Sequence, residues 1–192
     1  MRAIIGIGIG CVGLGLATAQ TLWDDFRGGF EMGTRRSWHV SGNSPANTLD
    51  TTHITFDGEY LQITAQPGTL YAGYNNIRNL PNLGIPALCG EWRIETRLQL
   101  SRGAIRDSYV QAGLILFRDA DNYFNLHLVY DPTQNLRLRV SAGHEAGGRY
   151  EWSGLDTSPW DAASGNSVRL LIRYDPATNR VHFLYDREDG GF

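Results

Sequence analysis

The chain has 192 residues, of which only two are cysteine, and it contains no internal repeat or low-complexity linker. Cys11 lies in a segment that we expect to be removed, so Cys89 remains alone and no intramolecular disulfide is predicted. A domain of this length can bury a sufficient core without covalent cross-links. Cys89 is therefore interpreted as a small buried hydrophobic residue and not as a reactive thiol.

Lysine is absent, and all 17 residues counted as lysine or arginine are arginine, while the formal net charge is −3. A negative chain argues against binding nucleic acid or another polyanion through bulk charge. Every guanidinium is a planar fork that suits carboxylates, phosphates or sugar hydroxyls. Five tryptophans and nine tyrosines supply flat surfaces for stacking, although core packing also uses such residues.

The motifs of several enzyme classes are also missing. There is no Gly-x-Ser-x-Gly elbow, no zinc-binding spacing of His or Cys, and no phosphate-binding glycine loop. Glycosidases use two carboxylates that lie about 5–5.5 Å or about 6.5–9.5 Å apart. Glu91 and Glu95 share one face of a predicted strand, but Cα atoms four residues apart along a strand are roughly 13 Å from each other. A paired-carboxylate glycosidase is therefore not predicted.

The N-terminal residues predict a secretory signal peptide over residues 1–19. A basic start is followed by an uncharged run over residues 3–16, and Ala17-Thr18-Ala19 gives a cleavage pattern. We expect residues 20–192 to be one secreted domain, extracellular or periplasmic, monomeric and without membrane attachment. A membrane anchor is the alternative, but an uncharged run of about 17 residues that is rich in glycine and alanine is marginal for spanning a bilayer.

Alternation of apolar and polar residues predicts seven strands. They span residues 60–65, 91–100, 109–118, 123–131, 136–141, 168–174 and 180–185. Turns rich in Asp, Asn, Gly and Pro separate most of them, and no amphipathic helix pattern is present. Short strands at this spacing predict an all-β fold, a two-sheet antiparallel sandwich or jelly roll.

Four segments carry a resemblance to a known superfamily: residues 22–26, 90–97, 110–123 and 181–190. In this order they resemble the concanavalin A-like lectin/glucanase superfamily, in particular the jelly-roll domain at the C-terminus of some β-xylosidases and related standalone secreted bacterial proteins. The resemblance spans most of residues 20–192 and implies a jelly roll that contacts glycans and binds a structural calcium. It also implies a return strand after the Asp-Gly turn near residue 190, so we expect the sequence to lack one or two final strands.

Strand alternation separates a core face from an outer face. The residues predicted to point toward the core are Trp92, Ile94, Thr96, Leu98, Leu100, Val110, Ala112, Leu114, Leu116, Phe124, Leu126, Leu128, Leu136, Leu138 and Val140. We expect the four strands between residues 91 and 141 to form one antiparallel meander. Phe117 would then pair with Tyr123, and one cross-strand row would contain Glu95, Gly113, His127 and Arg139. The next row would contain Arg97, Gln111, Val129 and Arg137.

The outer face of this meander is predicted to be a concave glycan-binding surface. Tyr109 and Tyr123 would stack on sugar rings, while polar side chains would bind hydroxyls. The predicted ligand-binding residues are Arg93, Glu95, Arg97, Tyr109, Gln111, Tyr123, Asn125, His127, Arg137 and Arg139. This interpretation rests on analogy at the level of the fold. The alternative is a solvated sheet surface with cross-strand ion pairs, each worth up to ~1 kcal/mol.

Two further functions stay open. Glu95 and His127 are catalytic candidates for a proton-transfer reaction, as in a glycoside hydrolase, lyase or keto-sugar hydrolase. A surface that binds another protein is the second alternative. No cofactor is expected to be required, and Asp24 and Asp25 are predicted ligands of a structural calcium. Asp119 and Asp121 are interpreted as turn residues and not as metal ligands.

Overall fold

The computed structural model describes residues 38–41, 51–56, 61–73, 80–83, 90–100, 109–119, 121–134, 137–154 and 167–187. These residues form an all-β structure in which every strand pair is antiparallel. Their helical structure consists of three short 3-10 turns, η1 (Thr51–His53), η2 (Tyr71–Gly73) and η3 (Pro132–Gln134). None of the described helices is long and apolar enough to cross a membrane. The predicted signal peptide, Cys89, Asp24, Asp25 and residues 188–192 lie outside the described residues.

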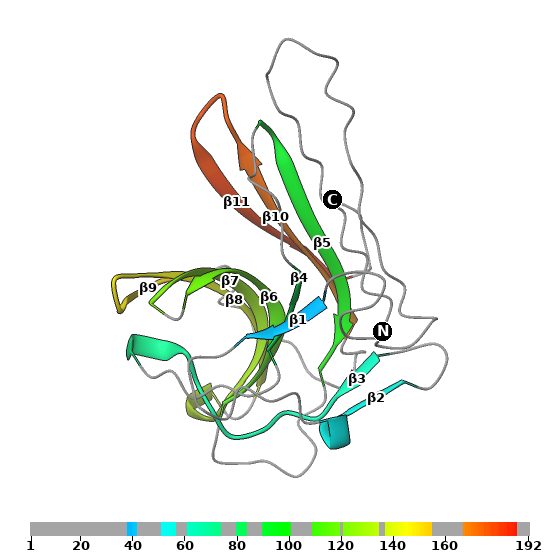
Figure 1. Ribbon diagram of the computed structural model, residues 1–192. Helices are drawn as coiled ribbons and strands as arrows, with labels where there is room; N and C mark the ends of the chain where they lie inside the picture. The colour runs from blue at the N-terminus through cyan, green and yellow to red at the C-terminus, as the bar shows by residue number, and fades with distance from the viewer. Residues whose placement is uncertain are drawn as a thin grey trace.

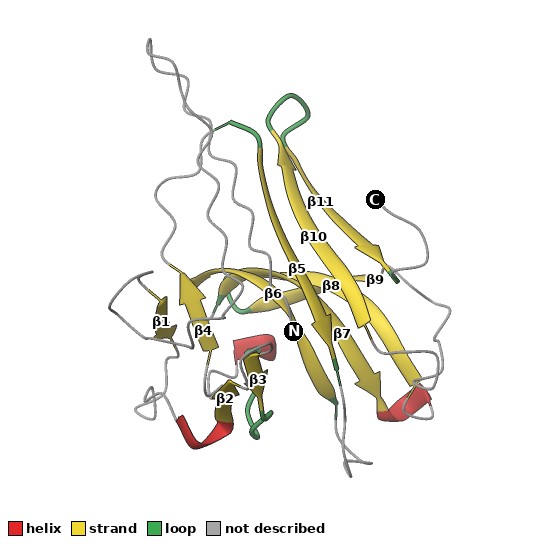
Figure 2. Ribbon diagram, turned by 90° about the vertical axis from the view of Figure 1, so that its right-hand side faces the viewer, coloured by secondary structure: helices red, strands yellow, loops and turns green. Residues whose placement is uncertain are grey.

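Two sheets contain most of the strands (Figure 1). The four-stranded sheet has the order β6-β7-β8-β9, formed by Val110–Asp119, Asn122–Asp131, Arg137–Ala146 and Arg149–Gly154. The three-stranded sheet has the order β11-β10-β5, formed by Arg180–Asp186, Ser167–Asp175 and Trp92–Gln99. Figure 2 shows β5, β10 and β11 side by side.

Two small sheets complete the described structure. In one of them, β1 (Trp38–Ser41) pairs with β4 (Leu80–Leu83). In the other, β2 (Ile54–Phe56) pairs with β3 (Leu61–Ile63). Of these four short strands, the sequence predicted only the segment that contains β3, because runs of three or four residues are too short to show alternation.

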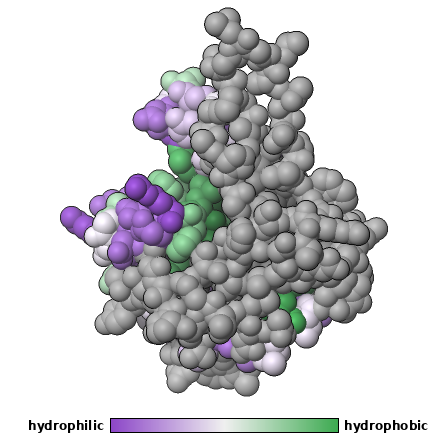
Figure 3. Space-filling model, in the orientation of Figure 1, coloured by the Kyte–Doolittle hydropathy of each residue, from purple (hydrophilic) through white to green (hydrophobic). Residues whose placement is uncertain are grey.

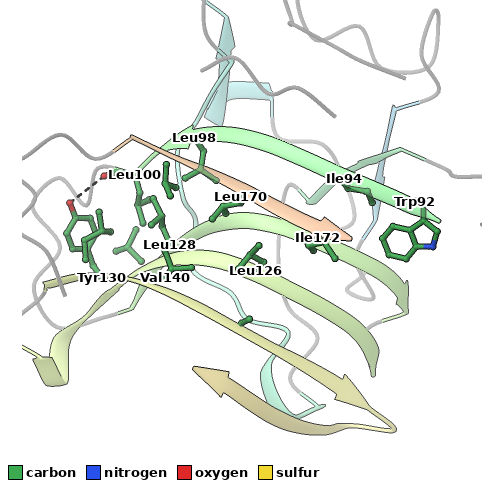
Figure 4. Packing of buried hydrophobic residues seen from close by; sticks show 14 residues of the cluster. Trp92, Ile94, Leu98, Leu100, Leu126, Leu128, Tyr130, Val140, Leu170 and Ile172 are labelled. Atoms are coloured by element: carbon green, nitrogen blue, oxygen red, sulfur yellow. Dashed lines mark hydrogen bonds between the residues drawn. The ribbon is translucent and has the colours of Figure 1, made fainter. Parts of the chain in front are cut away.

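One hydrophobic cluster contains side chains from both larger sheets (Figure 4). Trp92, Ile94 and Leu98 come from β5, Leu126, Leu128 and Tyr130 from β7, Leu138 and Val140 from β8, and Leu170 and Ile172 from β10. The hydroxyl of Tyr130 donates a hydrogen bond to the carbonyl of Leu100 at 3.4 Å. Burial of each such aliphatic or aromatic side chain stabilises the fold by about 1.5–3 kcal/mol. The predicted core face of β5, β6, β7 and β8 is therefore confirmed for the described residues, except at Phe124; Leu136 lies outside the described residues.

The core is less completely covered between the hairpin ends of the two sheets. There, Figure 3 shows apolar surface (green) between two groups of polar residues (purple). Phe124 shares the core face of β7 but is exposed, and its ring lies 5.5 Å from that of His144 and 6.3 Å from that of Phe183. Leu114, Leu116 and Phe183 are only partly buried. Phe124 therefore lies at the margin of the core and not inside it.

The predicted four-strand meander is wrong. β5 pairs with β10 and not with β6, so Glu95 lies opposite Leu171 instead of Gly113. The chain crosses from one sheet to the other between β5 and β6. Alternation alone did not reveal this crossing, because strands of both sheets present the same pattern of one apolar and one polar face.

Within the four-stranded sheet, part of the predicted register is confirmed. Phe117 pairs with Tyr123 and Gly113 with His127. His127, however, pairs with Ser141, while Arg139 pairs with Val129. The 3-10 turn η3 makes the connection between β7 and β8 longer than the predicted tight turn, and this shifts the register by two residues. A shift of two keeps every side chain on its predicted face.

Candidate functional site

The structure divides the predicted ligand-binding residues between two surfaces. Arg93, Glu95 and Arg97 lie on β5, on the face of the three-stranded sheet that points away from the core. Gln111, Tyr123, Asn125, His127 and Arg139 lie on the non-core face of the four-stranded sheet. The shared core separates Glu95 from His127. The two side chains therefore do not meet, and the prediction that they act together in proton transfer is wrong.

Glu95 is held in an ion pair. Its Oε1 accepts hydrogen bonds from Arg169 Nε at 3.1 Å and from Arg169 Nη2 at 2.6 Å. Arg169 Nη1 also lies 4.0 Å from Asp186 Oδ2. The carboxylate of Glu95 thus neutralises an arginine on the neighbouring strand, and this role differs from the predicted catalytic one.

The non-core face of the four-stranded sheet carries a cluster of aromatic side chains. We call the aromatic face the set formed by Tyr71, Tyr123, Asn125, His127, Ser141, Glu145, Tyr150 and Trp152. β7, β8 and β9 contribute all of them except Tyr71, which belongs to η2. In Figure 1, η2 lies below the curved four-stranded sheet, and β10 and β11 lie above it. The aromatic face and the three-stranded sheet are therefore on opposite sides of the four-stranded sheet.

Cross-strand pairing arranges the aromatic face in three rows. Tyr123, Glu145 and Tyr150 form the first row, and Asn125, Gly143 and Trp152 form the second. His127, Ser141 and Gly154 form the third. Opposite residues in an antiparallel pair have Cβ atoms about 4.5–5.5 Å apart, so side chains within one row are in reach of each other.

Glu145 is a buried acid in the first row, only 2% exposed. Its Oε2 lies 3.0 Å from the Tyr123 hydroxyl and accepts a hydrogen bond from the Ala72 backbone N–H, also at 3.0 Å. Burial raises the pKa of Tyr123 above its usual value of 10.0, and the adjacent Glu145 raises it further. The Tyr123 phenol therefore stays protonated as a donor, and Glu145 links η2 to the sheet.

Tyr150 belongs to the first row, and its ring extends over Gly143 of the second row. Its hydroxyl donates a hydrogen bond of 2.9 Å to Asn125 Oδ1. A Cβ at Gly143 would overlap the Tyr150 hydroxyl, so only glycine leaves room for this ring. Burial raises the pKa of Tyr150 to about 12, which keeps it neutral. Asn125 is consequently oriented by Tyr150, with its amide NH₂ left to donate elsewhere.

His127 is 4% exposed, and neither of its ring nitrogens has a hydrogen-bond partner among the described residues. Burial lowers the pKa of His127 to about 4, so the imidazole is neutral near pH 7 and offers one donor and one acceptor. A Cβ at Gly113, on the opposite strand, would overlap the backbone of His127. The Trp152 ring lies 6.3 Å from the imidazole, centroid to centroid.

Two aromatic rings of this face are open to solvent. Trp152 is 52% exposed and Tyr71 is 48% exposed, with their centroids 6.4 Å apart. Tyr150 lies between them, 5.1 Å from Tyr71 and 5.0 Å from Trp152. The contacts hold the two exposed rings next to the half-buried Asn125 and the buried His127.

Tyr123 is not a stacking residue, contrary to the prediction, because it is 4% exposed and packs against Leu70 and Tyr150. Tyr109 is 52% exposed. Ile115 lies in the same cross-strand row as Trp152. Tyr109 is six residues before Ile115, a distance of roughly 20 Å along the strand. The two predicted stacking residues therefore do not form one surface.

The remaining predicted residues do not converge either. Arg139 pairs with Asp131 through a short charge-assisted contact and is half-buried. The side chain of Arg137, like Asp24 and Asp25, lies outside what the structure describes.

Asp119 Oδ1 accepts hydrogen bonds from Asp121 N–H and from Asn122 Nδ2, as expected for a turn residue. Within the described ranges, no group of three or more His, Cys, Asp or Glu side chains is placed to hold a metal ion.

Sequence reasoning missed Tyr71, Glu145, Tyr150 and Trp152. A signal existed for the last three, because Gly147-Gly148 is a favoured two-residue hairpin turn and both glycines have positive φ, 61° and 77°. The turn extends β8 to Ala146 and creates β9, in which Tyr150 and Trp152 alternate onto one face. Tyr71 gave no signal, since it reaches the sheet from a distant part of the chain.

No protein-family model, curated protein or solved structure matches the chain. What this chain does is therefore inferred from its own residues and their geometry.

Proposed function

We propose that the chain is a carbohydrate-binding domain and that the aromatic face holds the glycan. The observation that carries this proposal is the pair of exposed rings, Trp152 and Tyr71, held beside buried polar groups. Sugar rings have apolar C–H faces that pack on flat aromatic surfaces, and their hydroxyls need a few directional polar partners. Ligand sites in general combine many apolar and aromatic contacts with a small number of placed polar groups.

The polar partners in this proposal are Asn125, His127 and Ser141. The Asn125 amide has free donor capacity because Tyr150 occupies only its oxygen. His127 has a donor and an acceptor without partners among the described residues. Ser141 lies directly opposite His127. A sugar hydroxyl, which both donates and accepts, is complementary to such a set.

The charge of the aromatic face favours a neutral sugar. Glu145 is the single charged side chain in its three rows, and Arg139, the nearest cation along β8, is paired with Asp131. A uronic acid or sulfated sugar would bring a second negative charge close to a buried carboxylate, which is unfavourable at low local dielectric. We therefore propose neutral glycans as the ligand class.

The finer fold is part of the proposal. We propose that the two larger sheets are those of a concanavalin A-like jelly roll, that residues 20–192 are secreted, and that Asp24 and Asp25 hold a structural calcium. The shared core of the two sheets and the sequence resemblance support the jelly roll. The link from this fold to sugar binding is an analogy and adds less than the exposed rings do.

The proposal is tested with Trp152→Ala and Tyr71→Ala on a panel of neutral and acidic polysaccharides, read by affinity electrophoresis and by calorimetry with oligosaccharides. Each variant is expected to weaken binding of a neutral glycan about 3–10-fold, the equivalent of about 0.5–1.5 kcal/mol for an aromatic contact. Tyr109→Ala is the matched control, since Tyr109 is equally exposed but about 20 Å away. Equal losses in all three variants would contradict the proposed site.

A protein-binding surface is the second candidate, because exposed Trp and Tyr residues are also enriched at the energetic centres of protein interfaces. Simple sugars separate the two functions. If a neutral monosaccharide or disaccharide competes with the bound partner, the face binds glycans; if binding depends on Trp152 but resists all sugars, the partner is a protein.

A further inference from the structure

The three-stranded sheet carries a row of two arginines and a histidine on the face that points away from the core. Arg93 on β5 lies opposite Arg173 on β10, and Arg173 lies opposite His182 on β11. We call these three residues the arginine row. Like charges directly opposite each other destabilise an antiparallel pair, so two arginines in this arrangement require an explanation.

A second pair of opposed arginines in the same sheet has its counter-charges. Arg97 lies opposite Arg169, and Arg169 lies opposite Asp186. Arg169 binds Glu95 at 2.6 Å and lies 4.0 Å from Asp186. Two carboxylates therefore neutralise that row within the protein.

The arginine row has no such neutralisation. None of its three residues forms an ion pair or hydrogen bond with another described residue, and Arg173 Nε and His182 Nε2 are buried without a partner. Buried N–H donors are normally satisfied, and an unsatisfied one calls for a missing acceptor. Among the residues that the structure describes, the row thus presents two guanidiniums and an imidazole without an acceptor.

The nearby acids bind other groups or form no ion pair with the row. Glu95 is committed to Arg169. Asp175 interacts electrostatically with His182, but its carboxylate accepts bonds of 2.9 Å from Ala177 N–H and from the Thr178 hydroxyl in the β10–β11 turn. Glu91 is exposed and makes no ion pair with the row.

We propose that the arginine row binds an oxyanion, namely a carboxylate, sulfate or phosphate group, between Arg93 and Arg173 with His182 as a further donor. A guanidinium presents two parallel N–H groups that match the spacing of two oxygens on such a group. The bound anion relieves the repulsion between the opposed arginines and supplies the missing acceptors. The two adjacent arginines give a local positive charge, which makes this compatible with a net charge of −3 over the whole chain. The site lies across the core from the aromatic face and is independent of glycan binding there.

The test uses the full chain and compares sodium sulfate, phosphate and glucuronate with sodium chloride at equal ionic strength, by thermal unfolding and by calorimetry. We expect sulfate to raise the melting temperature more than chloride does, and Arg93→Gln and Arg173→Gln to weaken sulfate binding at least tenfold. Arg118→Gln is the matched control, because Arg118 is exposed on β6 and its loss changes the net charge equally. A sulfate response that is absent, or equal in wild type, Arg93→Gln and Arg118→Gln, would overturn the proposal.

Two further arms identify the source of the anion and separate this site from the aromatic face. A polyuronate or sulfated polysaccharide is compared with free glucuronate or sulfate. If the polymer binds more tightly, and Arg93→Gln removes this difference, the anion is part of a polymer. Preference for the free ion identifies a small oxyanion. Trp152→Ala must leave the sulfate response unchanged, so loss of glycan binding and loss of anion binding can be told apart. Loss of the sulfate response in Trp152→Ala would contradict an independent site.

Discussion

Removal of the Tyr123 hydroxyl tests whether Glu145 ties η2 to the sheet. In Tyr123→Phe the ring and its packing remain, but Glu145 Oε2 loses the donor at 3.0 Å and keeps the Ala72 N–H. Glu145 is 2% exposed, so water does not readily replace the lost donor. A hydrogen bond to a buried charged group contributes about 1.5–3 kcal/mol, which sets the expected loss of unfolding free energy. For a chain of this size that corresponds to a melting temperature lower by about 3–12 °C.

The measurement is urea unfolding followed by tryptophan fluorescence and by circular dichroism. Tyr109→Phe is the control, because Tyr109 is 52% exposed and its hydroxyl forms no hydrogen bond with another described residue, so its effect is expected to stay within about 0.5 kcal/mol. Since Ala72 neighbours Tyr71, Tyr123→Phe is also expected to weaken glycan binding. A Tyr123→Phe protein as stable as the Tyr109→Phe protein would refute the inference that Glu145 depends on this donor.

Two further predictions follow from the buried groups. Gly143→Ala places a Cβ against the Tyr150 hydroxyl and is expected to cost about 1–3 kcal/mol of unfolding free energy, whereas Gly154→Ala, with nothing within 4 Å, is expected to be nearly neutral in the same denaturation assay. The pKa of His127 is lowered to about 4 in the folded state, below its unfolded value of 6.5. Between these two pH values the unfolded state binds more protons than the folded state. The free energy of unfolding therefore falls as the pH drops from 6.5 to 4. Wild type is expected to lose about 2–3 kcal/mol more than His127→Gln between pH 7 and pH 4.5; equal losses would show that this histidine is not buried in neutral form.

Strand positions and the faces of the strands were predictable from the sequence because both are local. A period of two assigns Leu126 and Leu128 to one face and His127 to the other wherever the strand pairs. The pairing of Phe117 with Tyr123 was also predictable, since a short turn fixes the register of its hairpin. These features need no knowledge of distant parts of the chain.

The strand that pairs with β5 and the burial of Tyr123 on the aromatic face were not predictable, because both depend on contacts between residues far apart in the sequence. Glu95 meets Arg169 from 74 residues away, and Tyr123 approaches the carbonyl of Leu70 from 53 residues away. Alternation places Tyr123 off the core face but does not say whether another segment buries it there. For the same reason the sequence did not show that Trp152 and Tyr71, and not Tyr123, are the exposed rings of this face.

The most direct test of glycan binding at the aromatic face follows the indole N–H signal of Trp152 in a ¹H–¹⁵N spectrum. The protein is titrated with the neutral oligosaccharide that binds most tightly in the panel. Trp92 is the internal control, because it packs in the core on β5, where its ring stacks on Tyr174 at 5.7 Å. A saturable shift of the Trp152 signal, with the Trp92 signal unmoved, is the expected result. If the oligosaccharide binds while the Trp152 signal stays in place, the glycan is held elsewhere and the proposed site is contradicted.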